Sequence, residues 1–305
     1  MFREHFGLTG LPFRKDLPTS QLFPSQQHQE LVSRLQYIIQ TRAFGLITGE
    51  TGAGKSTAVR ALYDQVDRTQ HQFVYIADSE LNPRSFYRDV LGQLGVQAPF
   101  HGREAKRLFE TTLLEGYRSH GRQPVIALDE AHLLAPEMLQ EIRFILNFQF
   151  DSVSPISFGL VGQPELRSKL KLRAYEALLQ QVQVRYRLGG LPPDQVGPSI
   201  EHQMRLAGAV RPIFSEHAVQ ALAALTRGIP RLINAYGTGC LLDACAHDQK
   251  VVDGWPQSST PLTRQWPGGK RERSQRQVLP VLGTFCVGAG GVGHSGAKER
   301  CRRQD

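Results

Sequence analysis

Residues 46–57 of this 305-residue chain read LITGETGAGKST, an apolar run followed by a glycine-rich turn, a lysine and two hydroxyl residues. Residues 49–56 fit the pattern G-x-x-x-x-G-K-[ST] without a mismatch. Glycines in such a turn let backbone N–H groups point inward, where a Cβ would block a phosphate. A chance glycine-rich turn is the alternative, but an apolar run precedes this one and a helical pattern follows it. The stretch therefore predicts a strand, a phosphate-binding loop (P-loop) and a helix.

The lysine and the hydroxyl that end the pattern have separate expected roles. Lys55 is expected to reach the β- and γ-phosphates of a nucleotide, and Ser56 to ligate Mg²⁺. The helix that begins near Lys55 points its partially positive end at the same anion. ATP and Mg²⁺ are therefore the expected cofactors. The residues expected to bind the nucleotide are Gly49, Glu50, Thr51, Gly52, Ala53, Gly54, Lys55, Ser56 and Thr57.

A second apolar run ends in two carboxylates, in the stretch PVIALDEAH at residues 124–132. Asp129 is expected to hold Mg²⁺ from the end of a strand, and Glu130 to polarise the attacking water. A solvated acidic loop is the alternative interpretation. The letters DEAH also invite a helicase interpretation, which we discount because the chain is too short for two RecA-like cores.

Short apolar runs alternate with helical patterns through the middle of the chain. Such runs are typical of strands buried on both faces, and their alternation with helices predicts a parallel sheet with right-handed crossovers. We therefore expect an α/β fold with a five-stranded sheet flanked by helices. Its strands are expected at 44–48, 73–77, 125–128, 156–161 and 182–188, and its helices at 56–66, 83–94, 106–119 and 136–148.

The two ends of the chain differ from this middle part. Before a helix expected at 27–40, four phenylalanines alternate with prolines, which predicts an extended strap pinned to the core by its aromatic rings. Three helical patterns without a strand, at 195–206, 215–226 and 230–246, predict a small all-α lid. Periodicity is then lost, and the basic tail is expected to be disordered. The expected domains are 1–43 (strap and helix), 44–190 (α/β), 191–253 (lid) and 254–305 (tail).

The overall composition says little about binding partners. The net charge is +8, but 9 of the 36 Lys and Arg residues and 3 of the 28 Asp and Glu residues lie from Gly254 onward. The rest of the chain has 27 basic and 25 acidic residues, so the excess is in the tail. We expect a cytoplasmic protein with four free thiols, because no apolar run reaches the roughly 18 residues of a membrane span and no signal peptide is recognisable.

Two further motifs accompany the P-loop and the Asp-Glu pair. Gln163 ends an apolar run in the phrase VGQPEL, and Arg231 lies in RGIPRLIN at the start of a lid helix. This combination and order of motifs resembles the AAA+ ATPases. The resemblance implies that Gln163 is sensor 1 and that Arg231 is sensor 2, which reaches the nucleotide from the lid. A loop residue and a surface charge are the respective alternatives.

The N-terminal sequence narrows the resemblance. The run FGLTGLPF, a histidine before a helix, a tyrosine near its end and then the P-loop resemble the GspA/ExeA-type group of AAA+ ATPases, to which VGQPEL also belongs. The resemblance covers residues 1–250, most of the chain. It implies one of two roles: a secretion-pathway ATPase, or a short helper of transposition similar to the MuB, TniB and TnsC proteins.

We expect the transposition helper, because neither a membrane span nor a wall-binding domain follows Asp253. ATP hydrolysis would then control a self-oligomer, with double-stranded DNA and a transposase as partners. A general secretion pathway A-type ATPase and a nucleotide-switched signalling or defence ATPase are the alternatives. Lys169, Lys171 and Arg173 could contact DNA phosphates, although a solvated basic helix is the simpler interpretation.

One position departs from the group. An arginine just before the fifth strand commonly acts there as a finger that completes the site of a neighbouring subunit, whereas the matching residue here is Gln181. Arg173, Arg185 or Arg187 could substitute for it.

Overall fold

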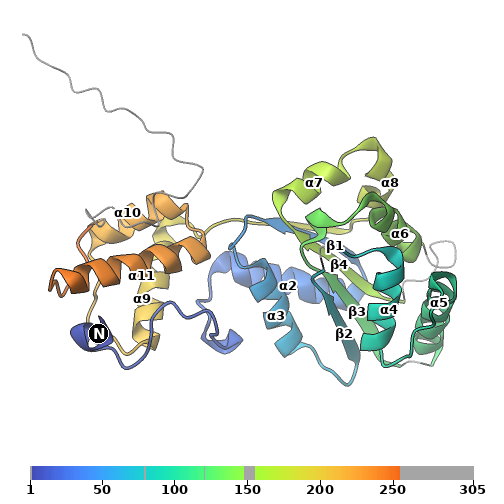
Figure 1. Cartoon of the computed structure of the whole chain (residues 1–305), viewed down its shortest axis with the longest axis horizontal. Coiled ribbons are helices and arrows are strands. Elements are labelled where there is room, and N and C mark those ends of the chain that lie inside the picture. The colour runs from blue at the N-terminus through green and yellow to red at the C-terminus, as the bar shows by residue number, and fades with distance from the viewer. Residues whose placement is uncertain (1, 79, 120, 148–154, 255–305) are drawn as a thin grey trace, which may run out of the picture. The chain divides into compact units, whose positions relative to one another are not determined.

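A parallel sheet of five strands carries the fold (Figure 1). The computed structural model describes residues 2–78, 80–119, 121–147 and 155–254. The strands pair in the order β2-β3-β4-β1-β5, and every neighbouring pair is parallel. The predicted α/β fold is confirmed, whereas the disorder predicted for the tail falls outside the described residues. The strands are β1 (Phe44–Gly49), β2 (His71–Ile76), β3 (Gln123–Leu128), β4 (Ser157–Gly162) and β5 (Val184–Leu188).

Two sets of helices cover the two faces of the sheet. Successive strand residues point to opposite faces, so Leu46 packs in the cluster that contains α4, α5 and α6, while Ile47 packs with α2 and α3. Every residue of β1 and β4 is buried, which explains their uninterrupted apolar sequences. The helices are α2 (Gln26–Thr41), α3 (Lys55–Gln65), α4 (Pro83–Gln93), α5 (Gly102–Arg118) and α6 (Pro136–Leu146).

Several short helical segments are absent from the sequence-based prediction. They are only one or two turns long, which is too short for a 3.6-residue apolar period to develop. Three of them lie between β4 and β5, where the sequence suggests no helix apart from a basic one around residues 169–173. These segments are η2 (Ala131–Leu133), α7 (Pro164–Leu170), η3 (Arg173–Tyr175) and α8 (Glu176–Gln180).

The lid is built from three helices with an apolar cluster of their own, α9 (Pro193–Leu206), α10 (Glu216–Thr226) and α11 (Pro230–Ala246). Ser215 caps α10 by accepting a hydrogen bond from Ala218 N at 3.1 Å. Cys240 of α11 belongs to the cluster, and burial raises the pKa of its thiol to about 11. It therefore packs as a small apolar side chain, as the sequence indicates.

The N-terminal strap anchors its aromatic rings in the lid, not in the α/β core as we expected. Its first residues form a short helix, α1 (Phe2–Phe6), so the strap is also not fully extended. Leu8 and Phe13 are buried among the lid helices. The Phe13 ring lies against Gly237 of α11, where a Cβ would come within 2.7 Å of the ring. The prolines forbid a long helix, but they do not decide on which surface the aromatic residues pack.

The same strap continues onto the helix that follows the P-loop. It forms the turn η1 (Thr19–Gln21), where Thr19 Oγ1 donates to Asp64 Oδ2 of α3 at 2.7 Å. Arg60 of α3 donates to Leu17 O at 3.0 Å. The strap therefore has one end fixed in the lid and the other on α3.

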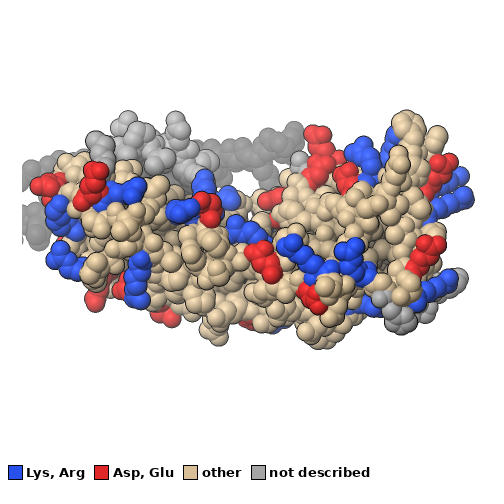
Figure 2. Space-filling model, turned by 90° about the horizontal axis from the view of Figure 1, so that it is seen from below, with Lys and Arg blue, Asp and Glu red and all other residues tan. Residues whose placement is uncertain are grey.

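Charged side chains of both signs are interspersed on the face drawn in Figure 2. This mixture agrees with the near balance of basic and acidic residues before Gly254. Among the described residues, no helix combines the length and the apolar character that crossing a bilayer requires.

Phe13→Ala tests the strap's anchor. The change leaves a cavity in the lid cluster, so we expect the free energy of unfolding to fall by about 3–5 kcal/mol in urea titrations. Phe100→Ala is the control, because Phe100 is 77% exposed and its loss should change stability by about 0.5 kcal/mol or less. Equal effects of the two substitutions would contradict the described packing.

Candidate active site

The loop after β1 turns on two glycines. Gly52 and Gly54 have φ values of 84° and 107°, in the left-handed region that glycine adopts without strain. Ala53 N donates to Glu50 O at 3.1 Å, and α3 begins directly afterwards at Lys55. The first N–H groups of an α-helix lack intrahelical acceptors and carry partial positive charge. The loop and the helix start together therefore present backbone donors suited to a phosphate.

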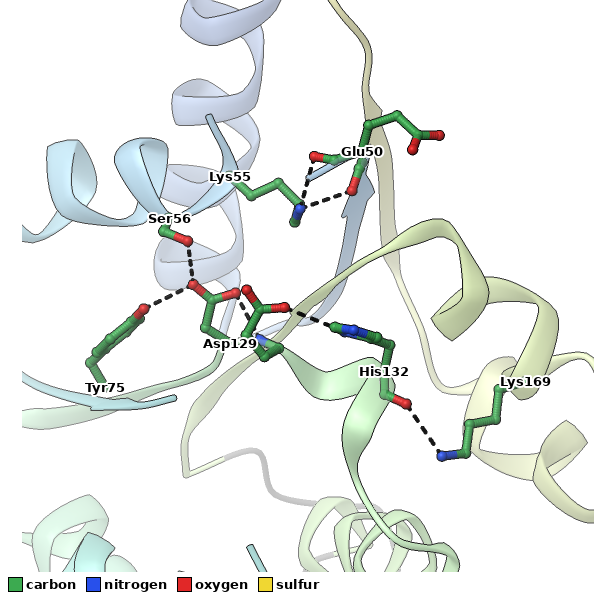
Figure 3. Close-up of polar contacts among 9 residues, drawn as sticks. Glu50, Lys55, Ser56, Tyr75, Asp129, His132 and Lys169 are labelled. Atoms are coloured by element: carbon green, nitrogen blue, oxygen red, sulfur yellow. Dashed lines mark hydrogen bonds and ion pairs between the residues drawn. The ribbon is translucent and has the colours of Figure 1, made fainter. Parts of the chain in front are cut away.

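Lys55 is buried beside this loop, with only 6% of its surface exposed. Its Nζ donates to Gly49 O at 2.8 Å and to Glu50 O at 3.1 Å (Figure 3). Burial lowers the pKa of the ammonium, against the attraction of Glu130, Asp129 and Glu50. A buried cation held by two carbonyl oxygens fits a phosphate as an additional partner.

Asp129 follows β3 and is also buried, with 3% of its surface exposed. Its Oδ2 accepts hydrogen bonds from Ser56 Oγ at 2.6 Å and from the Tyr75 hydroxyl at 2.8 Å (Figure 3). Its Oδ1 accepts one from Glu130 N at 2.8 Å. The structure therefore brings together Ser56 and Asp129, the two residues expected to ligate Mg²⁺.

This pair fits Mg²⁺ better than a metal held by protein ligands alone. In the described ranges, no group of three or more His, Cys, Asp or Glu side chains is arranged to hold a metal ion. Mg²⁺ is usually bound through one or two carboxylates, with waters and phosphate oxygens completing its shell. A hydroxyl and a carboxylate beside a phosphate-binding loop match that preference.

Tyr75 is a site residue that the sequence reasoning missed. It lies on β2, next to β3 in the sheet, in register with Ala127. The amide of Gln93, the last residue of α4, brackets its backbone: Tyr75 N donates to Gln93 Oε1 and Gln93 Nε2 donates to Tyr75 O, both at 3.1 Å. Burial and the neighbouring Asp129 carboxylate raise the pKa of the phenol, so it stays a hydrogen-bond donor. The sequence signal for Tyr75 was weak: a tyrosine, with its polar hydroxyl, lies between the apolar residues Val74 and Ile76 of the strand.

Glu130 lies at the turn between β3 and η2. Its φ is 50°, an uncommon value for a residue other than glycine. Its side chain is 44% exposed, and Oε2 lies 3.4 Å from Nδ1 of His132 (Figure 3). The expected water-polarising carboxylate is thus next to Asp129 and within electrostatic reach of Lys55.

The two residues expected as sensors both lie near the P-loop. Gln163 directly follows β4, whose last residue, Gly162, pairs in register with Thr48 of β1. Within the described part of the chain, the Gln163 side chain makes no hydrogen bond. Arg231, near the start of α11, donates its backbone N–H to Gly52 O at 3.3 Å. Its side chain lies against Gly52, where a Cβ would come within 2.5 Å of the Arg231 Cβ.

Gln181, at the position of the expected finger, is bonded within its own chain, because its amide donates to Asn147 Oδ1. Arg185 donates to Leu179 O at 2.7 Å. Arg173 and Arg187 make no side-chain hydrogen bond or ion pair with other described residues. Of the three arginines considered as substitutes, these two are the ones left available for a neighbouring subunit.

The three basic residues considered for DNA contacts, Lys169, Lys171 and Arg173, have different surroundings in the structure. Lys169 is not a solvated side chain, because its Nζ donates to Leu134 O at 2.6 Å and to His132 O at 3.4 Å. Lys171 and Arg173 are exposed. Lys169 is therefore bonded to the loop that follows Glu130, and only the other two residues remain candidates for DNA phosphates.

The geometry of this loop and its carboxylates has known counterparts. Residues 37–170 match the family described as AAA domain. The match covers the part of the chain that contains the P-loop and the Asp129–Glu130 pair, and it supports the expected resemblance to the AAA+ ATPases.

The chain is also similar to General secretion pathway protein A of Aeromonas hydrophila, with 33% identity over 265 residues. The match covers 83% of this chain and 47% of that protein, so the chain spans about half the length of this relative. The similarity supports the resemblance to the GspA/ExeA-type group.

Two solved structures share the fold. Cdc6p of Pyrobaculum aerophilum has a TM-score of 0.58 at 17% identity, over 77% of this chain and 68% of its own. The ORC2 protein of Aeropyrum pernix, in its ADPNP–ADP complexes, has a TM-score of 0.56 at 15% identity, over 79% and 68%. At such identities the likeness shows a common fold.

Tyr75→Phe tests the hydrogen bond to Asp129. Loss of the hydroxyl removes one donor that orients the carboxylate, so we expect an increase of about 10-fold in the Mg²⁺ concentration needed for half-maximal tight ATP binding. Calorimetric ATP titrations at several Mg²⁺ concentrations measure it. Tyr63→Phe is the matched control, because Tyr63 is similarly exposed and its hydroxyl has no partner among the described residues. An unchanged Mg²⁺ dependence would rule out this role for Tyr75.

Proposed function

We propose that this protein is an ATP-hydrolysing switch, in which the nucleotide is held between the P-loop and the lid. The observation that carries the proposal is the contact of Arg231 with Gly52, beside the buried Lys55. Backbone N–H groups of the loop bind the β-phosphate, and Lys55 binds the β- and γ-phosphates. Ser56 and Asp129 hold Mg²⁺, which would neutralise charge on the phosphates.

The hydrolytic step is assigned to residues at the carboxyl ends of β3 and β4. Glu130 polarises the attacking water, and its position directly after Asp129, with its N–H bonded to Asp129 Oδ1, supports this role. Gln163 senses the γ-phosphate from the end of β4, and Arg231 reports its presence to the lid. Hydrolysis then changes the lid's contact with the P-loop, and with it the ability of the protein to self-associate.

In a self-associated form, a neighbouring subunit would supply the arginine finger. Gln181 has no positive charge, so the role falls to Arg173 or Arg187, whose guanidinium groups have no partner in the described part of the chain. A guanidinium from a neighbouring subunit would stabilise charge on the transferring phosphoryl group.

The similarity to the protein of Aeromonas hydrophila supports the proposal that this ATPase acts on a component of the secretion machinery. Its name assigns that protein to the general secretion pathway, and its sequence matches 83% of this chain. Components of the secretion machinery are therefore the first class of partner to test. A signalling or defence partner would instead be indicated by ATP-dependent oligomers that need neither DNA nor an envelope protein.

Double-stranded DNA and a transposase, the partners expected from the sequence, form the second proposal. It is supported by the resemblance of the N-terminal motifs to the GspA/ExeA-type group, one branch of which consists of helpers of transposition. The charge distribution adds little, because basic and acidic side chains alternate over the face in Figure 2. Genes for secretion components or for a transposase beside this gene would favour one proposal over the other.

Two substitutions test the ATPase. Lys55→Ala should abolish the heat of Mg·ATP binding, because the loop loses its cation. Glu130→Gln should retain binding and lower kcat by about 100-fold or more, because the water loses its base. Glu137→Gln, an exposed carboxylate on α6, is the control for Glu130→Gln. Wild-type kcat in Glu130→Gln would mean that another group activates the water.

The DNA proposal is tested by binding of purified protein to duplex DNA at moderate salt. Saturating ATP should lower the DNA concentration needed for half-maximal binding, and the effect should weaken with salt because phosphate contacts release counterions. No effect of ATP at concentrations that saturate the nucleotide site would exclude the DNA role and leave the ATPase proposal intact.

A further inference from the structure

The loop between Asp129 and α6 has a shape that brings two side chains together. Glu130 adopts its positive φ, and residues 131–133 form the turn η2, closed by Leu133 N donating to Glu130 O at 2.9 Å. Residues two positions apart do not face each other in a regular helix. This turn instead brings the side chains of Glu130 and His132 together. Glu130 Oε2 lies 3.4 Å from His132 Nδ1.

The side chains of His132 and Glu130 differ in how far they are exposed to solvent. The His132 side chain is 11% exposed, whereas that of Glu130 is 44% exposed. Nδ1 of His132 is buried and has no hydrogen bond within the described residues, which is costly for a polar atom. The Glu130 carboxylate lies 3.4 Å from this nitrogen, and a small shift of its side chain would form a hydrogen bond to Nδ1. The fixed ring therefore restricts a carboxylate that would otherwise rotate in solvent.

His132 is itself held by its backbone on two sides. At Gly162, the end of β4, a Cβ would come within 3.2 Å of His132 N, so the two backbone segments are closely packed. On the other side, Lys169 of α7 donates to His132 O at 3.4 Å (Figure 3). It also donates to Leu134 O at 2.6 Å. Hydrogen bonds from a charged donor are stronger than those from a neutral one. Lys169 thus holds the middle and the C-terminal end of the η2 turn against α7, the helix that follows Gln163.

We propose that His132 and Lys169 are positioning residues for Glu130, His132 through its ring and Lys169 through the backbone of the turn. The proposal rests on the proposed function, because it requires Glu130 to act on the water. It links Gln163, at the start of α7, to Glu130 through one short helix. Movement at the γ-phosphate sensor would then be transmitted to the catalytic carboxylate.

The position of Glu130 supports a productive rather than a withdrawn orientation. Glu130 N donates to Asp129 Oδ1 at 2.8 Å, and Asp129 Oδ2 accepts from Ser56 at the start of α3. Glu130 is thereby held beside the P-loop while its carboxylate contacts His132. Loss of the contact should for this reason lower turnover and leave ATP binding unchanged.

The first experiment separates turnover from binding. His132→Ala should lower kcat by about 10- to 100-fold, with a change of less than about 2-fold in the ATP dissociation constant measured by calorimetry. His132→Asn should restore most of the loss, because its amide nitrogen can take the place of Nδ1. Wild-type kcat in His132→Ala, or equal loss in both variants, would overturn the role of the ring.

The second experiment uses the lysine and keeps the proposal testable if His132 variants fail to fold. Lys169→Met should lower kcat and speed amide hydrogen exchange at Leu133 and Leu134, and Lys169→Arg should preserve both. Arg167→Met is the matched control, since Arg167 is an exposed cation on the same helix without a side-chain partner in the described ranges. If Lys169→Met behaves like Arg167→Met, the proposal for the lysine is wrong.

The third experiment distinguishes positioning from a purely structural role. In a Glu130→Gln background, His132→Ala should lower kcat no further, because its effect passes through the carboxylate. Additive losses would overturn the proposal. In protein without nucleotide, Glu130→Gln should also shift the imidazole nitrogen resonances of His132, a readout independent of activity. If wild-type protein binds and hydrolyses no ATP, the proposed function fails, whereas an unmoved His132 resonance contradicts the positioning contact alone.

Discussion

The burial of one ammonium and one carboxylate at the same edge of the sheet is the constraint on which this structure depends. Each charge is expensive to remove from water unless it has close polar partners. Lys55 finds two carbonyl groups of its own loop, and Asp129 finds a serine hydroxyl, a tyrosine hydroxyl and a backbone N–H. These polar partners come from different elements, so the charges can be accommodated only after β1, β2, β3 and α3 have assembled.

The strand order makes that assembly possible. In the order β3-β4-β1, the carboxyl ends of three parallel strands are adjacent, and they bring Asp129, Gln163 and Gly49 to one edge. Ligand sites in open parallel sheets form at such edges. Gly52 adds a second requirement, because its left-handed backbone and its contact with Arg231 both exclude a side chain. The glycine pattern of the P-loop therefore accommodates the contact with Arg231 as well as the proposed phosphate.

The sequence was informative wherever a local pattern carried the chemistry. The P-loop, the Asp129–Glu130 pair and the alternation of strands and helices could be recognised because each is encoded in neighbouring residues. Tyr75, His132 and Lys169 could not, because their partners come from other elements or from a turn with an unusual φ. Lys169 was grouped with Lys171 and Arg173 by proximity in the sequence, but its ammonium is fixed by carbonyl groups of η2. The strap was predicted to pack on the wrong surface for the same reason. Its aromatic residues indicate that the segment packs against the protein, but they do not indicate which surface it contacts.

The strap also sets a limit on how far the lid can travel. Phe13 is buried in the lid and Thr19 is bonded to α3, and six residues of chain span at most about 20 Å when fully stretched. The lid is thus tethered to the core twice, once through the chain that leads into α9 and once through this short segment. A hinge with two such attachments favours small rotations about the line between them over wide separation. Nucleotide turnover would then be read out as a change of angle, and partners that recognise the lid would respond to its tilt.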